Sequence, residues 1–153
     1  LGFRWIELSE NMAVTDAGSP PELMLADANN HLYGLQLGIE GVLWECNRWQ
    51  VEGGTKFGIY HNSADSFFAS PQGLAPPATA GADHTAFAAE LLLGVNYCLT
   101  DCIGLRAGYQ AMWIEGVAIL PEQLANPLYP AGQLDMGGSP FYHGFYLGVE
   151  ACF

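Results

Sequence analysis

The sequence predicts an all-β protein, an antiparallel up-and-down β-barrel or most of one, with about six to eight long strands. Three observations lead to this prediction. Apolar and polar residues alternate with period two along several long stretches, as they do when side chains point to opposite faces of a strand. Prolines, which central strands exclude, fall in only three segments. The expected connections are short turns at one end and long loops at the other.

The strands can be placed in order along the 153 residues, which suit a single domain. In the second strand, Leu35, Leu37 and Ile39 alternate with Gly34 and Gln36. The third, fourth, fifth and sixth strands repeat this pattern. The expected strands are roughly 2–9, 31–45, 49–61, 84–98, 102–118 and 141–153, with extensions considered at 12–15 and 22–25.

The polar face of these strands mixes glycine with Gln, Asn, Glu, Lys and Arg. The outward face of a soluble β-sandwich would carry many Lys, Glu and Thr residues, whereas a glycine-rich face with little lysine is typical of a crowded lumen. The pattern therefore favours a narrow barrel with lipid outside and a filled polar interior. Alternation alone does not say which face is inside, so a soluble β-sandwich or closed barrel with an apolar core remains open.

The connections give the barrel an expected orientation. Short links are expected at 46–48 and 99–101, and links of about twenty residues at 10–30, 62–82 and 119–140. Outer-membrane barrels place short turns in the periplasm and long loops outside. The short links are therefore expected on the periplasmic side.

Composition excludes other classes of protein. Half of the residues are hydrophobic and only 13% are charged, yet no apolar run reaches the length of about 18 residues that a transmembrane helix needs. The formal net charge of −12 would repel nucleic-acid phosphates, so no nucleic-acid partner is expected.

Strand parity places six charged residues on the glycine-rich face. Buried charges must be paired, so we expect an internal ion network that fills the lumen, with a cation path or proton site as the alternative. The six are Glu40, Glu52, Lys56, Glu90, Arg106 and Glu150.

The four cysteines, Cys46, Cys98, Cys102 and Cys152, are expected at the short-turn rim, all on the inward face. We predict that two disulfides close this rim, in an oxidising compartment. Three pairings are open, and a thiolate metal cluster is the alternative.

The four histidines, His31, His61, His84 and His143, are expected at the opposite rim. They are weak metal candidates, and we predict no metal, no cofactor and no enzymatic activity. Aromatic residues suggest two girdles. One would contain Trp5, Trp49, Tyr97 and Phe153, and the other Tyr60, Phe87, Trp113 and Phe141.

Four stretches of the chain combine glycine-spaced aromatic residues with alternating apolar residues. They are Gly-Phe-Arg-Trp-Ile-Glu-Leu at 2–8, Asn-His-Leu-Tyr-Gly-Leu-Gln-Leu-Gly at 30–38, Leu-Arg-Ala-Gly-Tyr-Gln-Ala-Met-Trp-Ile-Glu-Gly-Val-Ala at 105–118 and Phe-Tyr-His-Gly-Phe-Tyr-Leu-Gly-Val-Glu at 141–150. In these stretches the chain resembles the outer-membrane β-barrel proteins abundant in planctomycetes. The resemblance implies a barrel with further strands upstream and no defined biochemical activity.

Six strands are fewer than the roughly eight that small bacterial barrels use. Either the full-length protein has further N-terminal strands that this chain lacks, or neighbouring copies complete the edges of the sheet. These two possibilities lead to different functions.

The sequence thus predicts a structural or weakly pore-forming barrel of the bacterial outer membrane, with membrane lipid as its partner. The alternative is a self-assembling extracellular or envelope subunit, a homo-oligomer or filament, whose apolar strand faces pack against neighbouring copies.

Overall fold

The computed structural model describes residues 1–153 except 17–21, 70–76, 101, 126–132 and 152–153. Regular structure in the described residues consists of strands and a short helix. The elements are β1 (Gly2–Asp16), β2 (Glu22–Cys46), β3 (Trp49–Ala69), β4 (Ala78–Cys98), β5 (Ile103–Glu115), α1 (Leu120–Ala125) and β6 (Phe141–Ala151).

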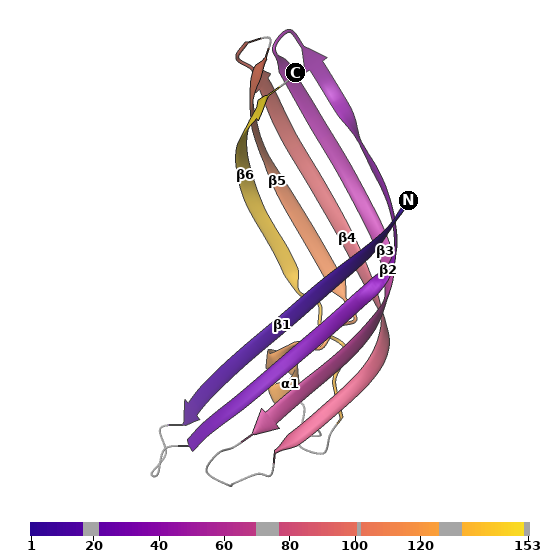
Figure 1. The fold of residues 1–153 in the computed structure, drawn as a ribbon, viewed down its shortest axis with the longest axis vertical. Helices are drawn as coiled ribbons and strands as arrows, with labels where there is room; N and C mark the ends of the chain where they lie inside the picture. The colour runs from indigo at the N-terminus through magenta and orange to yellow at the C-terminus, as the bar shows by residue number, and fades with distance from the viewer. Residues whose placement is uncertain (17–21, 70–76, 101, 126–132, 152–153) are drawn as a thin grey trace.

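The strands form a single antiparallel sheet in the order β1-β2-β3-β4-β5-β6, so every strand pairs with its neighbours in sequence. The sheet twists and curls into a half-barrel (Figure 1). The predicted all-β, up-and-down antiparallel fold is confirmed. Among the described residues, β1 and β6 are the two edges of the sheet and are not paired with each other, so this half-barrel is open.

Three strands are much longer than predicted, because β2 has 25 residues and β3 and β4 have 21 each. The boundaries predicted for the loops at 10–30 and 62–82 are therefore wrong, although the connections at that end are still longer than the short turns at the other. Small and polar residues such as Ala-Asp-Ala-Asn-Asn at 26–30 have low β-propensity. Pairing across the sheet nevertheless keeps them extended, since the register between β2 and β3 continues to Leu25 opposite Ala69.

The long connection predicted at 119–140 joins β5 to β6, but it begins earlier than expected. Gly116 has a φ of 87°, a left-handed conformation that glycine adopts without strain, and the fifth strand ends just before it. From Gly116 the chain turns back toward the sheet, and α1 lies on its hollow side (Figure 1).

Two clusters of buried apolar residues form where this connection packs against the strands. One cluster contains Leu32, Tyr60, Ala86, Ala88, Ile114 and Val117. The other contains Ala26, Ala28, Phe68 and Leu120. The apolar core therefore occupies only the part of the sheet that faces the connection.

A β-bulge interrupts the register between β2 and β3. Val42 pairs with Glu52, whereas Trp44 pairs with Val51, so Leu43 is an extra residue in β2. An extra residue shifts the alternation of side chains by one, and the last residues of β2 therefore point to the faces opposite to those that simple counting predicts.

Candidate functional site

The half-barrel divides into two halves along its strands, each with an inner and an outer face. The kind of side chain on a face differs between the two halves. The turn half contains the short turns and comprises the described residues of 2–5, 33–59, 87–113 and 141–151. The loop half comprises the described residues of 6–16, 22–32, 60–69, 78–86 and 114–140. The inner face is the hollow side on which α1 lies, and the outer face is the opposite side (Figure 1).

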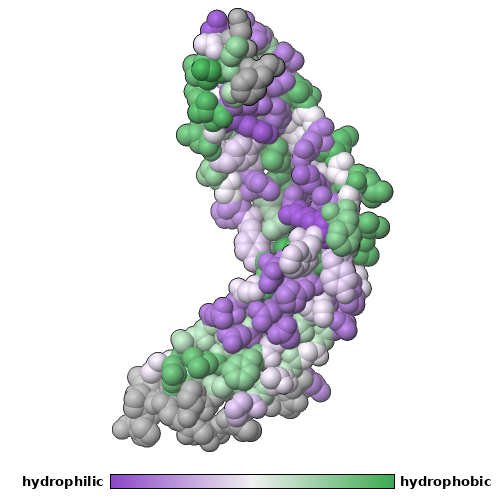
Figure 2. All heavy atoms as spheres, viewed as in Figure 1, coloured by the Kyte–Doolittle hydropathy of each residue, from purple (hydrophilic) through white to green (hydrophobic). Residues whose placement is uncertain are grey.

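Large apolar side chains are exposed on the outer face of the turn half, on every strand. We call this surface the apolar band. Figure 2 shows apolar side chains along the outer edges of the upper part of the molecule, with a polar strip between them. Monomers in water rarely expose a continuous apolar surface of this kind. The band contains Phe3, Trp5, Tyr33, Leu35, Leu37, Ile39, Leu43, Trp44, Trp49, Phe57, Ile59, Phe87, Leu91, Leu93, Val95, Leu105, Trp113, Phe141, Phe145, Leu147 and Val149.

The polarity of both faces reverses in the loop half. Its outer face carries mainly polar side chains, with Leu25 and Phe67 as exceptions near the ends of β2 and β3. Its inner face is mostly buried and largely apolar, as the two core clusters show. The polar outer residues include Glu7, Asp27, Asn29, His31, Ser63, Asp65, Asp83 and Thr85.

The apolar band has a similar height on five strands. A tilted β-strand needs about 9–11 residues to cross the hydrocarbon core of a bilayer. The height of the band therefore matches the thickness of a membrane. The band extends over residues 33–44, 49–59, 87–97, 103–113 and 141–151.

Aromatic side chains lie at both borders of the apolar band. Trp49 and Tyr97 lie at the turn-side border with their ring centroids 4.6 Å apart. At the loop-side border, Trp113 pairs in register with Phe141, and Trp5 pairs with Tyr33.

Two members of the predicted girdles are placed differently by the structure. The prediction puts Trp5 near the cysteines, but β1 begins opposite Gln36 in the middle of β2, so Trp5 lies at the loop-side border. The prediction puts Tyr60 in the loop-side girdle, but it lies on the inner face and is 2% exposed. Phe153 lies outside the described residues.

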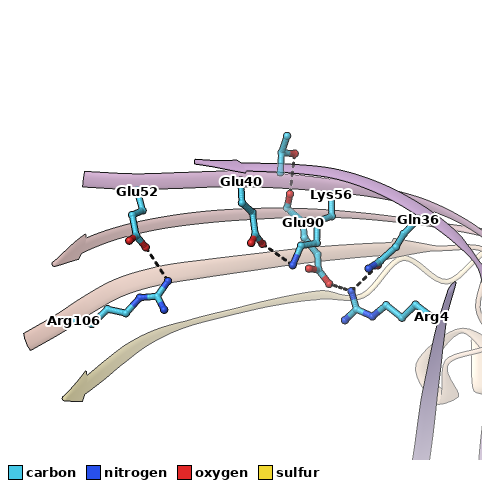
Figure 3. Close-up of polar contacts among 8 residues, drawn as sticks. Arg4, Gln36, Glu40, Glu52, Lys56, Glu90 and Arg106 are labelled. Carbon is cyan, nitrogen blue, oxygen red and sulfur yellow. Dashed lines mark hydrogen bonds and ion pairs between the residues drawn. The ribbon is translucent and has the colours of Figure 1, made fainter. Parts of the chain in front are cut away.

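The inner face of the turn half carries a row of ion pairs (Figure 3). Arg106 contacts Glu52 at 2.9 Å, and Lys56 contacts Glu40 at 2.7 Å. A third pair joins Arg4 to Glu90, whose side chain is only 8% exposed. Five of the six charges predicted for this face are thus paired across strands.

Arg4 also belongs to this network, a position that the sequence prediction omits. Its place in the alternation of β1, on the same face as Ile6 and Leu8, is the signal that would have included it. Among the described contacts, Glu150 makes no ion pair, although it shares the inner face. It lies on the edge strand β6, where it pairs in register with Gly104.

The glycines of the inner face make room for these long side chains. A Cβ atom at Gly38 would lie 2.7 Å from Cγ of Lys56, and one at Gly54 would lie 2.6 Å from Cγ of Glu40. The side chain of Tyr146 occupies the space above two more glycines in the same way. Glycine and long polar residues therefore fill the inner face together.

The three described cysteines share one rim but do not share one face. Cys46 and Cys98 are the last residues of β2 and β4, and Cys102 directly precedes β5. Because of the β-bulge, Cys46 pairs with Trp49 and lies on the outer face, whereas Cys98 follows the outward Tyr97 and has inner-face parity. The prediction that all cysteines point inward is therefore wrong for Cys46.

No disulfide joins the described cysteines, since Cys46, Cys98 and Cys102 are free and exposed. Cys152 lies outside the described residues. The disulfides thus stay a prediction.

Three histidines lie away from the rim, because the strands continue past them. The imidazole of His61 lies 3.5 Å from the carboxylate of Asp83, and both are on the outer face. His84 is on the inner face, where it pairs in register with Asn62, and His31 is on the outer face. The predicted placement of the histidines at the rim is therefore wrong for these three.

His143 lies near the start of β6, where its ring stacks on that of Phe141 with the centroids 5.3 Å apart. In the described part of the chain, no three His, Cys, Asp or Glu residues are grouped closely enough to hold a metal ion. His61 and His143 thus contact neighbouring side chains on the surface of the sheet.

The chain matches no protein-family model, no curated protein and no solved structure. Its resemblance to planctomycete outer-membrane proteins therefore stays a prediction. None of the described helices is long and apolar enough to cross a membrane.

Proposed function

We propose that this chain forms part of the wall of a bacterial outer-membrane β-barrel with a structural role and little or no conductance. The observation that carries the proposal is the apolar band, which has the height of a bilayer and ends within two residues of the same register position on neighbouring strands. Lipid acyl chains would cover the band, and the aromatic borders would lie at the two membrane interfaces.

The reversal of polarity supports this arrangement. A strand that leaves the membrane meets water on its outer face, so its outer residues should become polar at the interface, as they do from Tyr33 to His31 on β2. The loop half would then project from the outer leaflet, with the short turns and their cysteines in the periplasm. Any disulfides at this rim would stabilise the barrel from the periplasmic side.

The inner face supports a structural role. Most of its charges are paired with one another, and the long side chains of Lys56, Glu40 and Tyr146 lie over inner-face glycines, as in the polar interiors of small barrels. A closed bacterial barrel has about eight strands or more, so strands beyond these six would complete the wall.

Tryptophan fluorescence tests the lipid-facing band. Trp5, Trp44, Trp49 and Trp113 all lie in the band and are 49–64% exposed. We expect that vesicles with brominated acyl chains quench their emission strongly after the full-length protein folds into them. Unbrominated vesicles provide the control, and unchanged emission in brominated vesicles would contradict the proposal.

A second candidate function is a self-assembling envelope subunit, favoured by the open edges of the described sheet. On β6, Phe145 is 88% exposed and Leu147 is 83% exposed, so a neighbouring copy would find an apolar edge there. Fractionation separates the two functions. Release from membranes by a salt wash, as polymers that need no detergent, would favour the subunit over the barrel.

A further inference from the structure

The connection between β5 and β6 packs into the hollow of the loop half instead of extending away from the sheet. Val117 and Ala118 are fully buried, and Leu120 is 2% exposed. Ile119 packs against the core cluster that contains Leu32. These contacts cover the inner face where it would otherwise be an open apolar surface.

Two buried asparagines of the sheet hold this connection in place. Asn30 of β2 donates a hydrogen bond to the carbonyl of Ala118 and accepts one from its amide, both at 2.7 Å. Asn62 of β3 donates to the carbonyl of Gly116 at 3.1 Å and to Oδ1 of Asn30 at 3.0 Å. The side chains thus pair with the backbone of the connection much as a neighbouring strand would.

Further hydrogen bonds fix the shape of the connection. Glu10 of β1 accepts a bond from the amide of Leu120 at 2.8 Å. The amide of Gly138 donates to the carbonyl of Val117 at 2.9 Å. The described residues on both sides of α1 are therefore tied to each other and to the sheet.

We infer that residues 116–125 and 133–138 form a plug that closes the loop-side end of the lumen and is held there by Asn30 and Asn62. This inference rests on the proposed function, because a lumen exists only in a completed barrel. The turn half has no such cover in the described residues: Glu40 is 54% exposed and Arg106 is 40% exposed on the same inner face. The charged part of the lumen is thus accessible from the turn side alone.

Conductance of the full-length protein across planar bilayers tests the plug. We expect the unaltered protein to remain closed. In Asn30→Ala the frequency of channel openings should rise by at least about tenfold, because the substitution leaves buried backbone groups of the plug without partners. Asn29→Ala is the matched control, since Asn29 is the preceding residue of β2 but lies on the outer face and contacts Asp65 there. We expect it to behave like the unaltered protein.

An engineered disulfide between the sheet and the plug provides a second test if Asn30→Ala does not fold. Asn30→Cys combined with Ala118→Cys, with the native cysteines changed to serine, should be closed when oxidised and conduct after reduction. Equal conductance in the oxidised and reduced states would overturn the plug. If brominated lipids do not quench the tryptophan fluorescence of any variant, the proposal of a membrane barrel itself fails. If quenching is normal but conductance is the same in all variants, only the plug is contradicted.

Discussion

Gly34 lies where the backbones of β2 and β3 approach each other closely. A Cβ atom there would overlap the carbonyl oxygen of Ile59 and lie 2.7 Å from Cα of Tyr60, and backbone atoms cannot move aside cheaply. We expect Gly34→Ala to lower the free energy of unfolding by about 1–3 kcal/mol, measured by urea titration of the folded protein in vesicles. Gly41→Ala is the control in the same strand, because nothing lies within 4 Å of a Cβ atom there. Similar losses in both variants would contradict this account.

Burial separates the ion pairs of the inner face into strong and weak ones. The side chain of Glu90 is 8% exposed, so Glu90→Gln should leave Arg4 poorly compensated and cost about 2–4 kcal/mol in a urea titration. Glu40 is 54% exposed, and Glu40→Gln should have a much smaller effect although it also breaks an ion pair. A larger loss for Glu40→Gln than for Glu90→Gln would show that burial does not control the strength of these pairs.

At the level of single residues, strand parity predicts most of the inner charges correctly. It places Glu52 and Arg106 on one face, and the structure pairs them. Parity fails where the chain contains an irregularity that leaves no clear mark in the sequence. The bulge at Leu43 is such a case, and it moves Cys46 to the outer face.

At the level of elements, the strand ends make a specific prediction about the cysteines. Cys46 and Cys98 end β2 and β4, and their side chains are separated both by the intervening β3 and by the sheet itself, because they have opposite facial parity. We expect mass spectrometry of unreduced peptides to find no link between them under oxidising conditions. A Cys46–Cys98 peptide from monomeric protein would show that the bulge is absent or that its register is wrong.

The strands illustrate which elements a single sequence can predict. The turn half is predictable because β-branched, leucine and aromatic residues alternate there with glycine and polar residues. The loop half resembles loops in sequence because its strands alternate alanine with Asn, Asp and Ser, whose intrinsic preference for strands is weak. Those residues are extended because neighbouring strands and the 116–125 segment cover them, and such tertiary support has no local signature in the sequence.

For the whole molecule, the antiparallel up-and-down order follows from period-two patterning and the positions of the connections, but the reversal of polarity requires the structure. Each strand continues with the same period while the apolar residues change face, from Phe87 outside to Ala86 inside on β4. The pattern of a single strand therefore cannot show where the border of the apolar band lies. The border becomes visible only when the strands are aligned in register.

Arginine substitutions along one strand test whether this border is a membrane boundary. Leu91 and Thr85 both lie exposed on the outer face of β4, but Leu91 is in the apolar band and Thr85 is beyond its loop-side border. In a bilayer, Leu91→Arg should lower the free energy of unfolding by about 2–4 kcal/mol, whereas Thr85→Arg should change it by about 1 kcal/mol or less. Urea titration in vesicles measures both values. A leucine that is exposed to water gains little from its surroundings, so equal effects of the two substitutions would contradict a lipid-facing band.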